Sequence, residues 1–284
     1  MVYLKFIRSD GETFTVDNKQ WGMVNNIDGI SFPTIEINTT NLVGSAGSIL
    51  NSKRVSSRDI TFELVGKSND KQRLRNSALS FFNCAFSFKI LISYLGNKKR
   101  QIDCELYNIV MPAKSIGNFI TLTITMLALN PYFKSENMFN VLMAKTIPTS
   151  GFPYVSVLGK GFNVSLIKPT TSVQIKNNGD VSTPFKVVTK FTGDVVNPTI
   201  RLNDSDFTLI KSFTSNDILV IDFTNPVPII TINGVNSIQY IKRDTNFNNI
   251  LINRGISIFS FDAESGADKM QTNIYYYEQY LGVC

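Results

Sequence analysis

The side chains that most often carry catalysis are missing from this chain or scattered along it. Its 284 residues include no histidine, which excludes Ser-His-Asp and Cys-His catalysis and the histidine-based zinc enzymes. A glycosidase needs two carboxylates that face each other across a cleft. No pattern groups the glutamates of the N-terminal half into such a pair; they are Glu12, Glu36, Glu63 and Glu105. We therefore predict a protein that is not an enzyme, with a β-rich hydrolase as the least favoured alternative.

Metal and thiol chemistry is equally sparse. Cys84, Cys104 and Cys284 have no C-x-x-C spacing, and a cysteine-only zinc site needs four ligands. Their odd number argues against a disulfide framework and favours folding in a reducing cytoplasm. Acidic residues alternate within 262–268, but the downstream glutamate of a calcium loop is missing, so an acidic turn is the favoured interpretation. We expect no metal and no cofactor.

One short basic run is a candidate for protein contacts. The formal net charge is +6, yet the densest run, Lys98-Lys99-Arg100, has only three residues, whereas nucleic-acid-binding proteins concentrate lysine and arginine in a patch or stripe. The run occupies a predicted hairpin turn, where two interpretations stay open: a loop that contacts a neighbouring subunit, or a solvated tip. We retain Lys98, Lys99 and Arg100 as candidate subunit or partner contacts and predict no specific nucleic-acid site.

A group of tyrosines near the end of the sequence is the second candidate. In a strand, Tyr275 and Tyr277 share one face and Tyr276 takes the other. Tyrosine is enriched at protein interfaces. We therefore retain Tyr275 and Tyr277 as candidate contacts and expect at least one of the neighbouring tyrosines to be buried.

Membrane insertion is not expected. The first residues, Met1 to Arg8, lack the apolar stretch of a secretory leader. The most apolar segment, Leu79 to Leu95, is broken by Asn83 and Lys89, whereas a membrane span needs about 20 apolar residues.

The elements that position these residues are mostly strands. Apolar residues alternate with threonine from Ile120 to Met126, which is typical of a half-buried antiparallel strand. Asn233-Gly234 lies between two apolar runs and indicates a two-residue hairpin turn. Similar alternation predicts further strands at 59–64, 172–176 and 254–258.

One helix and one long hairpin are expected in the first half. Apolar residues recur at spacings of three and four from about Lys71 to Cys84, after the potential caps Asn69 and Asp70. The segment from Phe86 to Val110 predicts a hairpin that turns at Gly96-Asn97. The domain boundary is expected near Asn130-Pro131, which divides the chain into residues 1–134 and 135–284. The second domain reads as short strands separated by turns, a pattern typical of a β-sandwich or jelly roll.

Three groups of residues, in their order and spacing, resemble a known family. They are a glycine turn (Gly44 to Gly47) followed by Arg58-Asp-Ile60, then Arg73-Leu74 on the helix, then a strand ending in Asn130-Pro131-Tyr132-Phe133. In the second half, Asn178-Gly179, Asn197-Pro198 and the run Asp217 to Asp222 continue the likeness. The chain resembles the siphovirus tail-component family, the phage distal tail proteins.

The resemblance implies a mainly β fold and a structural role. The N-terminal domain would be a β-sandwich or split barrel with one helix and a long hairpin, and the C-terminal domain a galectin-like β-sandwich. The first domain would build a ring, typically of six copies, between the tail tube protein and the tail-tip hub protein. The second would hold receptor-binding or other baseplate proteins. DNA would pass through the channel without specific binding, and the protein would reside in the virion after assembly in the host cytoplasm.

Two alternatives remain open. The jelly roll could bind cell-wall saccharide as a host-recognition protein, although a shared fold does not transfer function. The chain could also be the equivalent baseplate component of a contractile tail or a phage-like bacteriocin.

Overall fold

The chain folds into two compact units. The computed structural model describes residues 2–17, 20–44, 46–94, 96, 98–112, 117–148, 165–169, 172–225, 227–243, 245 and 250–283. The first unit comprises Met1–Glu136 together with Gln279–Cys284, and the second comprises Asn137–Glu278. The sequence patterns predict one domain over all of 135–284. The structure instead returns Gln279–Val283, here called the return segment, to the first unit, because its strand pairs there.

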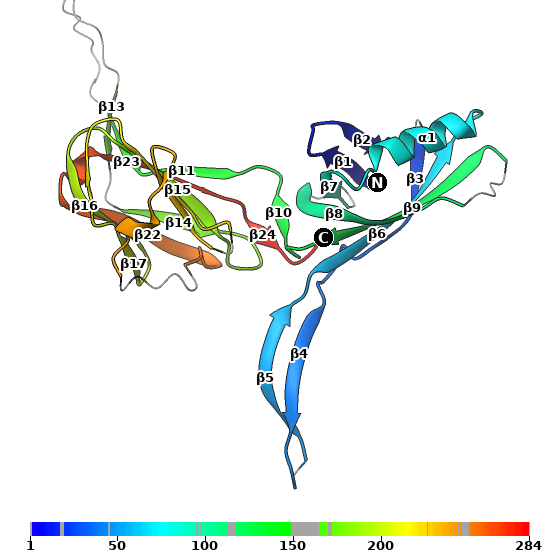
Figure 1. Ribbon diagram of the computed structural model, residues 1–284, viewed down its shortest axis with the longest axis horizontal. Helices are drawn as coiled ribbons and strands as arrows, with labels where there is room; N and C mark the ends of the chain where they lie inside the picture. Colours follow the sequence, from blue (N-terminus) through cyan, green and yellow to red (C-terminus); the bar gives the residue numbers. More distant parts are fainter. Residues whose placement is uncertain are drawn as a thin grey trace, which may run out of the picture. The chain divides into compact units, whose positions relative to one another are not determined.

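The first unit is built on one large antiparallel sheet in which the strand order is β2-β1-β7-β8-β9-β6-β3, with β10 and β24 off this path. Figure 1 shows the sheet curving around the side that carries the helix. Its strands are β1 (Tyr3–Arg8), β2 (Thr13–Val16), β3 (Trp21–Asp28), β6 (Arg58–Lys67), β7 (Ser87–Ser93), β8 (Arg100–Val110), β9 (Phe119–Ala128), β10 (Phe133–Ser135) and β24 (Gln279–Tyr280).

Alternation decides which side chains enter the core of this sheet. In β9 every second residue is buried, as the threonine pattern predicted, and Ile124 lies opposite Phe62 of β6. Both side chains are fully buried in one apolar cluster. The threonines point to the other face, where Thr61 and Thr125 approach within 3.3 Å. The predicted half-buried strand is confirmed.

The single α-helix within the described residues is α1 (Lys71–Phe81). Asp70 caps it, because its side chain accepts a hydrogen bond from the backbone N–H of Arg73. Leu74 and Ala78 are buried against the sheet. The helix ends three residues earlier than predicted, since Asn83 starts a turn in which its side chain accepts from the N–H of Ala85. The chain then enters β7, which pairs with β8 as the predicted long hairpin.

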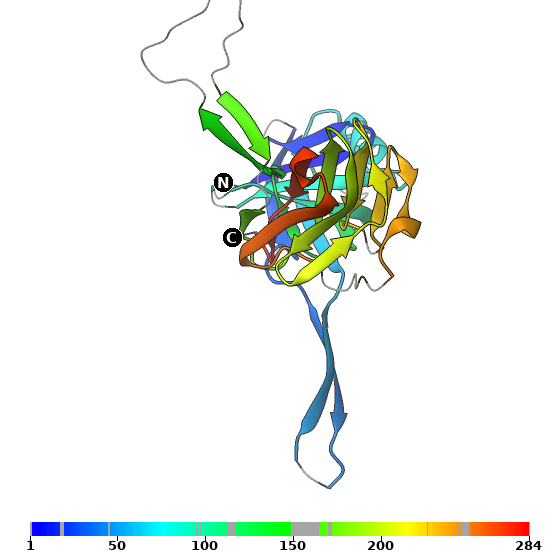
Figure 2. The same ribbon diagram turned by 90° about the vertical axis from the view of Figure 1, so that its left-hand side faces the viewer.

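A separate ribbon leaves this sheet between β3 and β6. Strands β4 (Ile35–Asn41) and β5 (Ser48–Val55) pair with each other as a two-stranded sheet. Figures 1 and 2 both show this ribbon, here called the arm, extending beyond the strands from which it starts. Gly44 and Gly47 turn the chain near its tip with φ of +81° and +109°, as the glycine turn in the sequence indicated.

The second unit is a sandwich of two antiparallel sheets. One has the order β11-β23-β15-β19-β20-β21, and the other has β14-β22-β16-β17 with β18 paired to β16. Phe185 of β15 packs edge-to-face on Phe259 of β22 at 5.4 Å between ring centroids, which joins the two inner faces. The strands are β11 (Phe139–Leu142), β14 (Ser172–Asn177), β15 (Phe185–Phe191), β16 (Val195–Leu202), β17 (Ser205–Thr208), β18 (Ser212–Phe213), β19 (Ile218–Asp222), β20 (Ile229–Ile232), β21 (Val235–Asn236), β22 (Gly255–Ser265) and β23 (Met270–Tyr276).

Short elements complete the second unit. A ribbon of β12 (Ala144–Pro148) and β13 (Ser165–Pro169) stands apart from both sheets, and two 3-10 turns, η1 (Ile238–Tyr240) and η2 (Ala267–Lys269), follow β21 and β22. Asn233 and Gly234 connect β20 to β21 with φ of +51° and +81°, so the predicted two-residue turn is confirmed. No helix among the described residues has the length and apolar content needed to cross a membrane.

Candidate assembly surfaces

The predicted basic run does not form a single patch. Lys98 is exposed. Lys99 lies 3.4 Å from Glu136 and 4.6 Å above the ring of Tyr3. Arg100, the first residue of β8, places its guanidinium carbon 3.0 Å from the centroid of the Tyr280 ring. Two of the three cations therefore make contacts within the first unit, and Lys98 is the member of the run that faces solvent.

The tyrosine group divides as strand alternation predicted. Tyr276 is buried, and its hydroxyl donates to the carbonyl of Lys176 at 3.3 Å. Burial raises the pKa of Tyr276, and the neighbouring Glu278 adds to the effect. Tyr275 and Tyr277 are half-buried. Tyr275 belongs to the outer face of its sheet, opposite Lys186, so it can contact a partner without leaving its strand.

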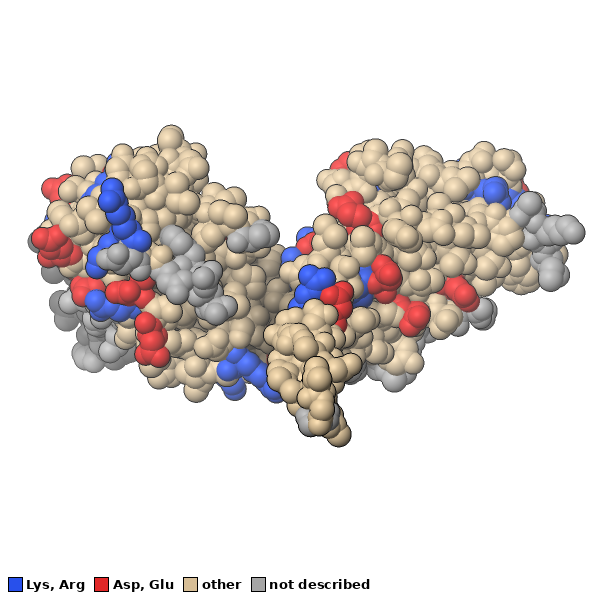
Figure 3. Space-filling model, turned by 60° about the horizontal axis from the view of Figure 1, so that its bottom comes forward, with Lys and Arg blue, Asp and Glu red and all other residues tan. Residues whose placement is uncertain are grey.

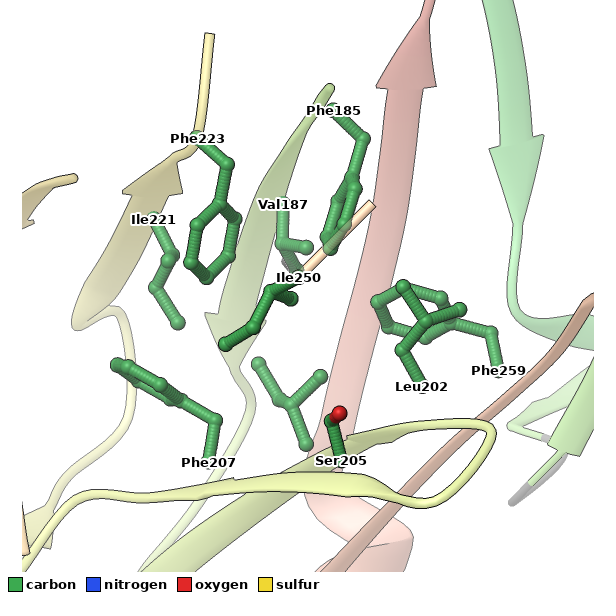
Figure 4. A pocket seen from close by; sticks show the side chains of 10 residues that line it. Phe185, Val187, Leu202, Ser205, Phe207, Ile221, Phe223, Ile250 and Phe259 are labelled. Carbon is green, nitrogen blue, oxygen red and sulfur yellow. The ribbon is translucent and has the colours of Figure 1, made fainter. Parts of the chain in front are cut away.

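A small apolar void lies in the interior of the second unit. Figure 4 shows the void between the two sheets, with aromatic and aliphatic side chains from both sides pointing into it. Its volume is about 10 Å³, and Ser205 contributes the polar side chain in an otherwise apolar lining. A buried water needs two to four polar partners. The void is therefore a small dry packing gap.

On the outer face of the five-stranded sheet, two cross-strand pairs place isoleucine beside polar side chains. Register places Ile258 opposite Gln174, and Ile256 opposite Lys176, with all four side chains exposed. Sugar rings usually stack on aromatic side chains, and this part of the face presents two isoleucines instead. Trp21, the one tryptophan of the chain, is buried in the first unit.

The two described cysteine thiols lie in different surroundings. On the face in Figure 3, basic and acidic side chains are interspersed. Within the described residues, no three His, Cys, Asp or Glu side chains come together as possible metal ligands. Burial, followed by the charges of Asp103 and Glu105, raises the pKa of the Cys104 thiol, which makes it unreactive. Cys84 is exposed, and Cys284 lies outside the described residues.

The acidic segment 262–268 forms the end of β22 and the turn into η2. Glu264 accepts a hydrogen bond from Asn197 at 2.6 Å, and Asp262 lies 3.8 Å from Arg201. These carboxylates therefore contact side chains of β16.

The arm is the most distinctive surface of the first unit. Polar pairs run across its two strands: Asn38 donates to Ser52 at 3.1 Å, and Asn51 donates to Thr40 at 2.6 Å. Near its base, Arg54 pairs with Glu36 at 2.5 Å. These cross-strand pairs set the register of a ribbon that has no apolar core of its own.

Several apolar side chains on the arm are exposed among the residues that the structure describes. Ile37, Ile49 and Leu50 are 58%, 54% and 59% exposed, and Val43 at the tip is fully exposed. An isolated two-stranded ribbon is marginally stable in water, and large exposed apolar patches often mark contact surfaces. The arm therefore presents apolar side chains to solvent.

Sequence reasoning missed the arm. The alternation Ile35-Glu-Ile37 before the glycine turn was the available signal, but β5 shows no alternation of burial because nearly all of its side chains are exposed. A strand with two solvated faces lacks the period-two pattern that identifies strands in a sequence.

The comparisons with known proteins cover part of the chain in one case and nearly all of it in the other. Residues 178–280 match the family model of the siphovirus-type tail component, C-terminal domain. The solved SPP1 Dit protein, a paradigm of the hub adsorption apparatus in phages that infect Gram-positive bacteria, has a TM-score of 0.69 at 13% identity, with coverage of 98% of this chain and 99% of that chain. No curated protein sequence matches the chain at a significant level.

Two structures of the phage P2 baseplate in its activated conformation also share the fold. The form with Ca has a TM-score of 0.53 at 10% identity, with 98% of each chain covered. The form with Sr has a TM-score of 0.54 at 12% identity, with coverage of 97% of this chain and 98% of that chain. At such identities the likeness establishes the fold. The predicted fold class and the resemblance to phage distal tail proteins are confirmed.

Proposed function

We propose that this chain, which has the fold of phage distal tail proteins, is a structural component of a phage tail tip that assembles with copies of itself. The observation that carries the proposal is the arm, which exposes Ile37, Ile49 and Leu50 on a ribbon that the rest of its own unit leaves uncovered. A second copy supplies the cover. The solved relatives are hub and baseplate proteins, which supports the same role.

The assembly that we propose is a closed ring, typically of six copies. A contact between an arm and a different surface of the next copy is heterologous, and a heterologous contact closes into a ring when its rotation allows. The first unit builds this ring, which joins the tail tube protein to the tail-tip hub protein. DNA passes through its channel without specific binding.

The second unit serves in this proposal as the attachment domain for receptor-binding or other baseplate proteins. Tyr275 and Tyr277 are the candidate contacts there, and Lys98 is the exposed candidate of the first unit. The protein acts in the virion, after assembly in the host cytoplasm, and has no enzymatic role.

The mass of the full-length chain in solution tests the proposal. Wild type is compared with a triple variant, Ile37→Ser, Ile49→Ser and Leu50→Ser, by light scattering and negative-stain imaging. We expect wild-type rings of about 190 kDa for six copies of the 31.8 kDa chain, and a smaller species for the variant. The cross-strand polar pairs remain in the variant, so the arm itself is retained.

The matched control replaces two isoleucines of similar exposure on the second unit, Ile256 and Ile258, with serine. This control should assemble as wild type does. A wild type that stays monomeric at high concentration, or equal loss of assembly in the control and the arm variant, would contradict the proposal.

The alternatives remain distinguishable. Binding of the full chain to cell-wall saccharide would favour host recognition, although the outer sheet face offers isoleucine where a sugar ring would need an aromatic surface. A sheath gene beside the coding sequence would indicate a contractile tail or a phage-like bacteriocin.

A further inference from the structure

We infer that the first unit contains a built site for the return segment, and that a chain lacking this segment cannot complete the unit or enter an assembly. The second half of this inference rests on the proposed function. The site lies entirely within the first unit, although its ligand follows the whole second unit in the chain. Three independent features define it.

The first feature is strand pairing. β24 of the return segment pairs antiparallel with β10, with Phe133 opposite Tyr280 and Lys134 opposite Gln279. β10 pairs in turn with β8 through Lys134 and Gln101. The return segment therefore completes a sheet that the first unit begins.

The second feature is a buried cation. Arg58 is 4% exposed. Its Nη1 donates to the carbonyls of Gly29 and Ser31 at 3.0 and 3.2 Å, and its Nη2 donates to the carbonyl of Leu281 at 2.5 Å. The return segment thus supplies one acceptor to a buried guanidinium, and a charged group needs such acceptors where water is excluded.

The third feature is tight packing. The backbone N–H of Val283 donates to the carbonyl of Ile30 at 2.9 Å, and Tyr280 and Val283 belong to the core of the first unit. A Cβ on Gly282 would lie 2.3 Å from the carbonyl oxygen of Ser31. The site thus admits glycine at this position and rejects larger residues.

A consequence for assembly follows from chain order. Residues 1–136 are synthesised first but lack their last strand until residues 279–283 have been made. A chain that stops within the second unit leaves the edge of β10 that pairs with β24 without its partner strand. Arg58 then lacks the carbonyl acceptor of Leu281. The ring-building unit is then incomplete, so truncated chains are excluded from the ring.

The test uses Trp21, which is buried in the core of the first unit and is the one tryptophan of the chain. Urea unfolding is followed by Trp21 fluorescence in wild type, in a chain that ends at Glu278, and in the full-length variant Gly282→Ala. The matched control is Gly193→Ala, where the new Cβ meets the flexible end of Lys269 instead of backbone. Hydrogen exchange of β15 and β19 reports the second unit in the same samples.

We expect the urea concentration at the midpoint of unfolding, followed by Trp21 fluorescence, to fall by about 1 M or more in the truncated chain and in Gly282→Ala. The midpoint of Gly193→Ala and the exchange of β15 and β19 should match wild type. If the truncated chain does not fold, Gly282→Ala decides. A Trp21 midpoint equal to wild type in either altered chain overturns the inference.

Co-expression tests the consequence for assembly. Tagged wild type is produced together with the chain that ends at Glu278, and the composition of the purified oligomer is measured by mass spectrometry. We expect the shorter chain to be absent; its incorporation in proportion to its expression would overturn the exclusion. A monomeric wild type would count against the proposed function alone, because the Trp21 measurement does not depend on oligomeric state.

Discussion

Arg58 donates a hydrogen bond to the carbonyl oxygen of Leu281 although 223 residues separate them in the sequence. The guanidinium carbon also lies 4.9 Å from the centroid of the Phe133 ring. Burial lowers the pKa of Arg58 to about 10, so the side chain remains a cation at neutral pH. One buried charge thus joins the loop after β3, strand β10 and the return segment.

Replacing Arg58 with methionine should destabilise the first unit. Methionine keeps much of the apolar contact but leaves the carbonyls of Gly29, Ser31 and Leu281 without their donor. We expect a loss of about 3 kcal/mol in the free energy of unfolding, measured by Trp21 fluorescence in urea. Arg54→Met is the control: Arg54 is exposed on the arm, where its ion pair with Glu36 is open to solvent, and its midpoint should stay at the wild-type value. Equal effects of the two variants would refute the special role of Arg58.

A buried pair of threonines provides a test inside the second unit. The hydroxyl oxygens of Thr189 and Thr272 lie 3.0 Å apart on β15 and β23, and both residues are fully buried. Either single valine substitution leaves one hydroxyl unpaired and should cost about 1 to 2 kcal/mol, whereas the double substitution should be nearly neutral. Urea unfolding followed by circular dichroism measures all three variants.

The matched control for this double-mutant cycle is the pair Thr61 and Thr125 in the first unit. Their hydroxyls are 3.3 Å apart but only half-buried, so water can replace a lost partner. Single valine substitutions there should have little effect. Additive losses in the Thr189 and Thr272 cycle would show that the two hydroxyls do not interact.

Substitutions of Asn233 separate two contributions to stability, the backbone conformation of the turn and the hydrogen bonds of the side chain. Asn233 has φ of +51°, its amide nitrogen donates to Asp217 at 2.8 Å, and its side-chain oxygen accepts from the N–H of Ile218 at 2.8 Å. Glycine keeps the backbone conformation and removes the side-chain bonds, while alanine loses both. We expect losses of about 1 kcal/mol for Asn233→Gly and about 2 kcal/mol for Asn233→Ala, by thermal unfolding. The reverse order would contradict this account.

Asp217 should make the stability of the second unit depend on pH. The backbone N–H of Thr214 and then the amide of Asn233 lower the pKa of Asp217. A carboxylate whose pKa is lower in the folded state stabilises the fold above its unfolded pKa, and this stability is lost as pH falls through the folded pKa. Asp217→Asn should therefore unfold at a lower temperature than wild type at pH 7.

The difference between wild type and Asp217→Asn should shrink below about pH 4, near the pKa of an unfolded aspartate. Other carboxylates titrate in both proteins, so the difference between the two unfolding temperatures is the quantity to follow. A difference that does not change between pH 7 and pH 3 would contradict the prediction.

Local patterns were enough to predict core strands such as β9 and the two-residue turn at Asn233-Gly234. Ile120 to Met126 alternate because one face of β9 is buried and the other is solvated, and Asn233-Gly234 favour the positive φ that a two-residue turn requires. The helix start near Lys71 followed from the potential caps Asn69 and Asp70, of which Asp70 is the cap in the structure. The helix end did not, because the chain must turn at Asn83 to reach β7, and that need arises in the sheet.

The sequence by itself determined a mainly β chain with two cores, one helix and no histidine-based chemistry, because periodicity and composition are local properties. Tertiary structure alone decided that Gln279–Val283 complete the first unit, that Arg58 binds Leu281, and that residues 35–55 form an arm. Contacts between distant segments leave no periodic trace, and a ribbon exposed on both faces shows no alternation. The partners of Arg58 and the exposure of Ile37 depend on which segments fold together, which one-dimensional patterns do not encode.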